Sequence, residues 1–118
     1  MIVVVWGGYH LLRPDSPDQI AEDQIELMQE AILTLENFND SGDAKSSIDK
    51  LGELTARYND LLKRRKKLGV EANQANENLT TEIKKLSGEL LNESLQVEIS
   101  DKDEAAEVTA AYEKFSSQ

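Results

Sequence analysis

The 118-residue chain contains no cysteine and a single histidine, His10. Disulfide frameworks, thiolate nucleophiles, zinc fingers and iron–sulfur clusters are therefore excluded. The Glu-x-x-His motifs of di-iron helical bundles are also missing, and no glycine-rich loop that could cradle a phosphate precedes a helix. From these absences we expect no catalytic site, no cofactor and no metal ion.

Glycine, proline and aromatic residues are scarce, with six glycines, two prolines and 5% aromatics. This composition disfavours a loop-rich β protein and any collagen-like or linker-like sequence. Hydrophobic residues make up 39% of the chain, and its length suits one domain with a real core. We therefore expect an N-terminal arm over residues 1–15 and one helical domain over residues 16–118.

Basic residues are in deficit, with 13 against 23 acidic residues and a net charge of −10. Nonspecific nucleic-acid binding depends on neutralising phosphates, so we expect no nucleic-acid partner. The charge is unevenly distributed along the chain. Residues 15–40 contain eight acidic and no basic side chains, whereas residues 43–68 contain eight basic and four acidic ones.

The first predicted helix begins at a capping signal. Ser16 can cap the amide of Gln19, Gln19 can complete a capping box, and Pro17 suits the first helical position. A turn-rich cluster predicts that the helix ends near residues 37–40. Its apolar stripe comprises Ala21, Ile25, Met28, Ile32 and Leu35, widened by Leu27, Ala31 and Phe38. A stripe this wide predicts two neighbouring helices.

Two further long helices follow. Asp43 or a neighbour opens the second, Gly69 ends it, and the short connection before it favours an antiparallel neighbour. Its predicted buried face comprises Ala44, Ile48, Leu51, Leu54, Tyr58, Leu61, Leu62 and Leu68. The third is predicted over residues 72–97. Its main stripe comprises Ala72, Ala75, Leu79, Ile83, Leu86, Leu90 and Val97.

A second apolar stripe on the third helix, formed by Leu91, Leu95 and Ile99, needs a cover. Cap candidates after Ser100 open a short fourth helix. Its apolar positions are Ala105, Val108, Tyr112 and Phe115. We predict that this helix folds back over the second stripe, the alternative being a dimer seam. The expected fold is all-α, an antiparallel bundle of three long helices plus a short C-terminal fourth, as a monomer or homodimer.

The run Lys63-Arg64-Arg65-Lys66-Lys67 has two interpretations. It could be a patch for nucleic acid or anionic lipid. The favoured interpretation is structural, because cations suit a helix C-terminus and an antiparallel hairpin brings them beside the acidic start of the first helix. The acidic side chains there are Asp15, Asp18, Glu22 and Asp23. Arg65 falls on the apolar stripe, so its stem should pack while its guanidinium reaches solvent.

The N-terminal arm opens with the apolar run Met1–Trp6, which is too short for a membrane span and lacks the basic start of a signal peptide. It is interpreted as a loosely packed arm, as the remnant of an export signal, or as a strand added to a partner's sheet. Together with the basic run it supplies a candidate interaction surface. That surface comprises Trp6, Tyr9, Lys63, Arg64, Lys66 and Lys67.

The layout from Asp18 to about Phe115 resembles a group of uncharacterised small exported helical proteins of bacteria, many of them lipoproteins. The segments that carry the resemblance are Asp18-Gln-Ile-Ala-Glu-Asp-Gln-Ile-Glu-Leu-Met28, Asp43-Ala-Lys-Ser-Ser-Ile48, the basic run ending Lys67-Leu-Gly69, and the short helix after Ile99. The resemblance implies an exported or envelope location on the periplasmic side. Trp6 stands where such relatives carry a lipid-modified cysteine, so membrane association is expected only if the chain is lipidated or signal-anchored.

Two functions are compatible with these observations. The leading hypothesis is a non-enzymatic, exported or envelope-associated helical protein that acts through contact with an unknown protein partner. The alternative is a cytosolic acidic regulator, antitoxin-like or anti-σ-like, that sequesters a basic partner. The acidic first helix motivates the alternative, and such binding should weaken steeply with ionic strength.

Overall fold

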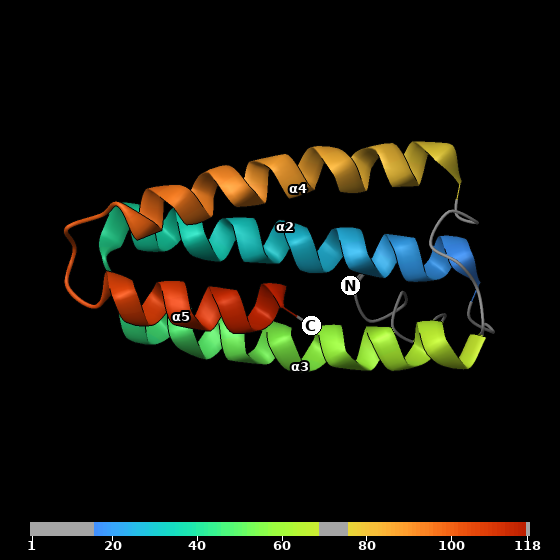
Figure 1. The fold of residues 1–118 in the computed structure, drawn as a ribbon, viewed down its shortest axis with the longest axis horizontal. Coiled ribbons are helices and arrows are strands. Elements are labelled where there is room, and N and C mark those ends of the chain that lie inside the picture. The colour runs from blue at the N-terminus through green and yellow to red at the C-terminus, as the bar shows by residue number, and fades with distance from the viewer. Residues whose placement is uncertain (1–15, 69–75, 118) are drawn as a thin grey trace, which may run out of the picture.

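The computed structural model describes residues 16–68 and 76–117. The elements are α2 (Pro17–Ser41), α3 (Ala44–Leu68), α4 (Glu77–Glu98) and α5 (Ala105–Ser116). Consecutive helices run in opposite directions along the bundle (Figure 1). The prediction of an all-α bundle with three long helices and a short fourth one is confirmed. Trp6, Tyr9 and Gly69, for which the sequence makes predictions, lie outside the described residues.

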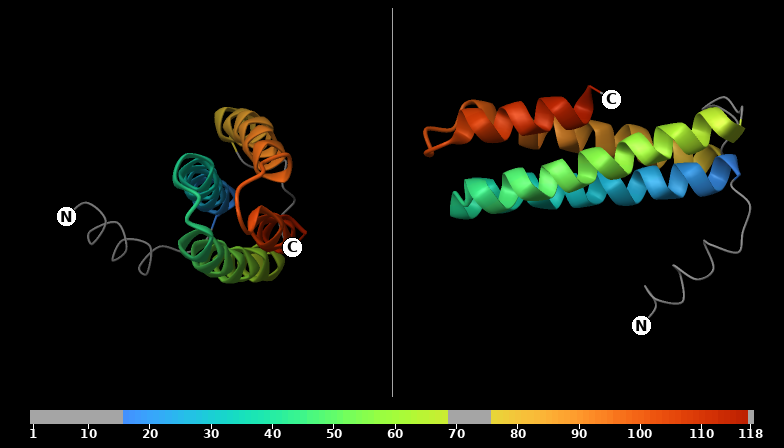
Figure 2. Two further views of the ribbon diagram at one scale, coloured as in Figure 1. Left: turned by 90° about the vertical axis from the view of Figure 1, so that its left-hand side faces the viewer. Right: turned by 90° about the horizontal axis from the view of Figure 1, so that it is seen from below.

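The four helices form a ring in which α2 and α5 each pack against both α3 and α4 (Figure 2). The neighbours α2 and α4 are parallel, as two hydrogen bonds show. The Asn76 backbone amide donates to Asp18 Oδ1 at 2.6 Å, where both helices start. Farther along, Asn39 Nδ2 donates to Glu93 Oε2 at 3.2 Å. The helix α4 therefore packs beside α2 and α5 and lies diagonally across the bundle from α3 (Figure 2).

Both ends of α2 are capped, and the Ser16 cap at its start is the one that the sequence predicts. Ser16 Oγ accepts from the Gln19 amide at 3.1 Å, with Pro17 at the first position of α2. The helix ends at Ser41, and Gly42 adopts the left-handed conformation with φ of 74° while its amide donates to the Phe38 carbonyl. Local side-chain and glycine chemistry is sufficient to place this turn.

The start of α4 differs from the prediction. The helix begins at Glu77 rather than at residue 72, because Asn76 is its N-cap and accepts from the Asn78 amide at 2.8 Å. An asparagine side chain competes for backbone amides, which makes it a better cap than an interior helix residue. Asn76 thus sets the start of α4.

The core is centred on the interface of α2 with its two neighbours. Its fully buried large side chains are Phe38, Leu35, Leu51, Leu54, Leu61, Val97 and Val108. Within the predicted stripe of α2, Ile25 and Ile32 are only half-buried, whereas Leu27 and Ala31 are buried. The packing of α3 against one side of α2 moves the centre of the buried stripe toward that side.

The predicted cover over the second stripe of α4 is wrong. The helix α5 does fold back against α3 and α4, but Leu91, Leu95 and Ile99 remain 57%, 47% and 82% exposed. The apolar side of α5 instead fills the fourth corner of the bundle, where Val108 and Phe115 are buried. Burying those side chains in the common core encloses them on several sides, which a flat stripe on a single helix cannot do.

Candidate functional site

The basic run is partly used inside the bundle. Arg64 Nη2 lies 2.7 Å from Asp23 Oδ2, and Arg65 Nη2 donates to Gln24 Oε1 at 2.7 Å. The predicted pairing of the run with the start of the first helix is confirmed for Asp23. Asp18, also expected to take part, accepts the hydrogen bond from Asn76.

The remaining residues of the candidate interaction surface do not come together into one site. Lys63, Lys66 and Lys67 are exposed at the end of α3, and Arg64 is half-buried in its pairing with α2. The aromatic members of that surface, in the arm, belong to the undescribed part of the chain. The described residues thus offer a few exposed lysines rather than a built basic pocket.

A ladder of ion pairs continues along the seam between α2 and α3. Arg57 Nη1 lies 2.8 Å from Glu30 Oε2, Lys50 Nζ lies 3.0 Å from Glu30 Oε1, and Arg57 also reaches Glu26 at 3.7 Å. Glu53 joins both cations from within α3. Each pair alone contributes little, but together they favour the antiparallel register over its alternatives.

Glu30 is the electrostatic centre of this ladder. Burial by itself would raise the pKa of the Glu30 carboxyl, but hydrogen bonds from Lys50 and Arg57 and the attraction of both charges outweigh it, so the pKa lies below 4.5. The hydrogen bond to Glu30 raises the pKa of Lys50 above its usual value. Both groups are therefore held in their charged forms and serve to join the helices.

An uncharged exposed surface runs along the C-terminal half of α4. We call it the α4 outer face, and it comprises Gly88, Leu91, Asn92, Leu95, Gln96 and Ile99. The spacing of three and four residues places these side chains on one side of the helix. The other large hydrophobic residue that is exposed in the described chain, Leu33 at 58%, stands alone on α2.

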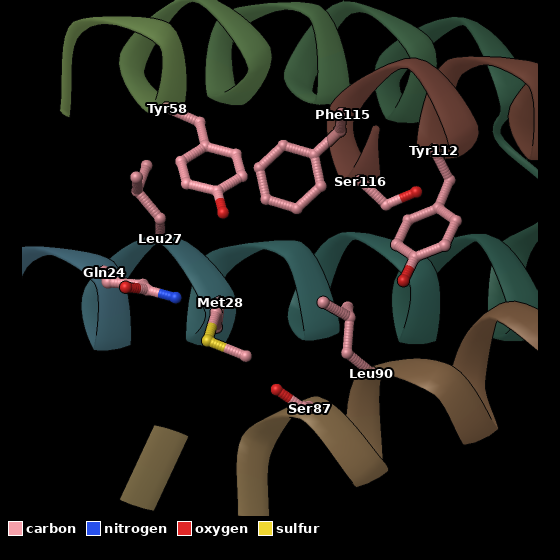
Figure 3. Close-up of a pocket in the computed structure, with 9 residues that line it drawn as sticks. All are labelled: Gln24, Leu27, Met28, Tyr58, Ser87, Leu90, Tyr112, Phe115 and Ser116. Carbon is pink, nitrogen blue, oxygen red and sulfur yellow. The ribbon is translucent and has the colours of Figure 1, made fainter. Parts of the chain in front are cut away.

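A cavity of about 200 Å³ lies among all four helices near the end of α5 (Figure 3). Its lining residues are Gln24, Leu27, Met28, Tyr58, Ser87, Leu90, Tyr112, Phe115 and Ser116. None of them is charged, in a chain with 31% charged residues. The ring of Phe115 lies 5.5 Å from that of Tyr58 and 6.3 Å from that of Tyr112, both tilted.

Two further hollows in the described part of the bundle have charged walls. One, between α2 and α3, includes Glu30 and Lys50. The other, between α2 and α4, includes Glu82, Lys85 and Glu89. The uncharged cavity is therefore chemically different from both of them.

The sequence predicts the aromatic residues of the cavity wall to be buried, but it does not predict a cavity. Tyr58, Tyr112 and Phe115 were expected on buried faces, and nothing in their spacing indicated a space between them. The feature of the sequence that could have indicated a cavity is the unequal length of the helices, since α5 has 12 residues and α3 has 25. A short fourth helix leaves part of the bundle without a fourth wall.

Other features typical of functional sites were sought in residues 16–68 and 76–117. They contain no cluster of three or more metal-ligating side chains. No helix in these segments combines the length and the apolar character needed to cross a bilayer. Comparison of the chain with protein-family models, curated proteins and solved structures finds no match.

Proposed function

We propose that the chain is a non-enzymatic protein that acts through protein–protein contact, and that the α4 outer face binds an apolar helix of a partner protein. The observation that carries the proposal is the exposure of Leu91, Leu95 and Ile99 in a row. A contiguous apolar stripe in water is unfavourable, and such stripes on folded proteins mark interaction sites.

The chemistry of the surface indicates the kind of partner. Because the α4 outer face carries no charge, a charged side chain buried against it would lose its hydration without gaining an ion pair. The i, i+4, i+8 spacing of Leu91, Leu95 and Ile99 forms a ridge that fits the groove of a second helix. A β-carbon added at Gly88 would meet nothing within 4 Å, so a partner helix could approach closely there. An amphipathic helix with an uncharged apolar stripe meets these conditions.

The acidic-regulator alternative receives less support. Asp23, Glu26 and Glu30, three of the acidic side chains that motivate it, are engaged by cations of α3. These carboxylates would have to leave their present partners to bind a basic protein. A salt titration of partner binding separates the hypotheses, because apolar contact should persist at an ionic strength that abolishes acidic mimicry.

The test is site-specific photo-crosslinking in the native cells. A photoreactive phenylalanine analogue replaces Leu95 in one variant and Leu33 in the other, two leucines that are both about half exposed. We expect a discrete crosslinked partner from position 95 that is absent from position 33. Leu91→Lys in the position-95 variant should abolish the crosslink. Identical products from both positions would contradict the proposal, and a product made only of two copies of this chain would replace the partner with a homodimer.

The expected envelope location stays a prediction. It rests on the resemblance and on the arm that lies outside the described residues. The intact mass and subcellular fraction of the native protein test it. A processed or lipidated species in the envelope fraction would support it, and an unprocessed species in the cytosol would contradict it.

A further inference from the structure

We propose that the cavity at the end of α5 is a binding site for a small neutral molecule with one aromatic ring and one hydrogen-bonding substituent. This site is separate from the α4 outer face, since the cavity-lining residues of α4 are Ser87 and Leu90. It does not depend on the protein contact proposed above.

The cavity follows from the unequal lengths of the helices. The helices α2 and α3 have 25 residues each, α4 has 22 and α5 has 12. In Figure 1, α5 stops alongside the middle of α3. The helix α5 ends at Ser116, and Phe115 and Ser116 at this end line the cavity.

The apolar walls fit one ring. Leu27, Met28, Leu90 and Phe115 are between 3% and 7% exposed, so they form a buried inner wall against which one face of a ring could pack. Ser87 and Ser116 are exposed and mark the side that is open to solvent. An apolar cavity of about 150 Å³ accommodates benzene. The volume of about 200 Å³ here suits a benzene ring with a short substituent or a fused indole. Tilted aromatic neighbours such as Tyr58 and Phe115 add favourable edge-to-face contacts.

Polar groups lie on several sides of the cavity, and Tyr112 and Ser116 also bring hydroxyl groups to its lining. In Figure 3 the Gln24 amide nitrogen, the Tyr58 hydroxyl and the Ser87 hydroxyl point into the space. Gln24 Oε1 accepts from Arg65, which leaves the amide nitrogen as a donor. Ser87 Oγ donates to the Ile83 carbonyl at 2.9 Å, which leaves its oxygen as an acceptor. The lining thus offers both a donor and an acceptor, which suit a hydroxyl or N–H substituent.

The absence of charge in the lining sets the specificity. A carboxylate or an ammonium group bound there would be desolvated without an opposite charge among the nine lining residues. A phenol or an indole, which is neutral at pH 7, avoids this cost. The matched probes are therefore p-cresol and its carboxylate analogue p-toluate, which differ chiefly in charge.

The experiment is an NMR titration of the full chain with each probe. We expect saturable shifts from p-cresol, with nuclear Overhauser contacts between its ring and the Met28 methyl group and the Phe115 ring. For p-toluate we expect affinity at least about tenfold lower. No saturation with p-cresol up to about 10 mM, equal binding of both probes, or contacts confined to Leu91, Leu95 and Ile99 would overturn the proposal.

A cavity-filling variant provides the second test. Ser87 is exposed on α4 and its side chain faces the cavity, so Ser87→Phe should place a ring where the ligand ring would lie. The control is Thr81→Phe on the exposed side of the same helix. We expect Ser87→Phe to weaken p-cresol binding about tenfold or more and Thr81→Phe to leave it unchanged. Equal effects of the two variants would show binding elsewhere. If Ser87→Phe does not fold, the Overhauser contacts in the unmodified chain decide.

Discussion

The two hairpins of the bundle are held in different ways. Between α2 and α3, the turn at Gly42 is tightly capped, and the ion pairs described between helices lie along this seam. Between α4 and α5, the connection passes through Glu104 in the left-handed conformation, and α5 begins without a side-chain cap. The α4–α5 hairpin contributes both the exposed apolar face and most of the uncharged cavity wall.

The two hairpins also differ in how much apolar surface they leave exposed to water. The α2–α3 hairpin pairs Asp23, Glu26 and Glu30 with cations of α3. Leu33 is its one large hydrophobic side chain that is exposed in the described chain. The α4–α5 hairpin buries one side of α4 but leaves Leu91, Leu95 and Ile99 in contact with water. Surface that folding does not use is available for binding, and both proposed sites involve the second hairpin.

The largest expected effect comes from truncating a core leucine in each hairpin. Leu51 on α3 is fully buried, so Leu51→Ala should reduce the free energy of unfolding by about 2–5 kcal/mol. Leu90 on α4 lines the cavity, so Leu90→Ala enlarges a space that water can enter and should cost about 2 kcal/mol. Chemical denaturation measures both values. A larger loss from Leu90→Ala would contradict the view that the second hairpin is less tightly packed.

A glycine in each hairpin should respond with opposite sign. Gly42 has φ of 74°, where a β-carbon is strained, so Gly42→Ala should lower the free energy of unfolding by about 1 kcal/mol. Gly88 sits in the exposed interior of α4 with open space beside it, so Gly88→Ala should raise it by about 0.5–1 kcal/mol. Thermal melts of the two variants test the pair, and stabilisation by Gly42→Ala would contradict the capping role.

The ion pairs of the first hairpin should give a smaller, pH-dependent effect. The pKa of Glu30 is lowered in the folded protein, so its stabilisation is fully present above 4.5 and is lost as the pH falls through the folded pKa. Glu30→Gln should cost about 1 kcal/mol near neutral pH and reduce the loss of stability on acidification. Glu36→Gln, at an exposed position of the same helix, is the control. Equal acid sensitivity of the Glu30 variant and the unmodified chain would rule out this role.

The smallest expected effect is the titration of Tyr112 in the second hairpin. Burial raises the pKa of its phenol above 10, although the hydrogen bond with Ser94 opposes this shift. The folded state therefore retains the proton better than the unfolded state, and the resulting stabilisation disappears as the pH rises through the folded pKa. We expect the absorbance titration of the unmodified chain to contain a phenol that ionises at a pH above that of an ordinary tyrosine, and Tyr112→Phe to remove it. The absence of such a phenol from the unmodified chain would indicate a solvated hydroxyl.

The helices and the first turn were predictable because their causes are local. Ser16 and Gly42 act on backbone groups a few residues away. The acidic start of α2 and the basic end of α3 lie at equal distances from one turn, so the turn alone brings them together. The predicted start of α4 at residue 72 was wrong because the apolar spacing continues through Ala72 and Ala75, whereas the Asn76 cap sets the start of the helix. The cavity was not predicted at all, since it depends on where α5 stops relative to three other helices.

The sequence alone determined which segments are helical, how the first two pair, and which classes of chemistry are excluded, because periodicity, capping and charge are properties of neighbouring residues. Only the tertiary structure decided that α4 packs beside α2 rather than beside α3, and that α5 fills the core corner rather than covering Leu91, Leu95 and Ile99. The short helix α5 could pack either over the second stripe of α4 or into the corner between α3 and α4. The corner encloses its apolar side chains on more sides, which removes more apolar surface from water. The position of α5 depends on contacts with two other helices, so the sequence of a single segment does not predict it.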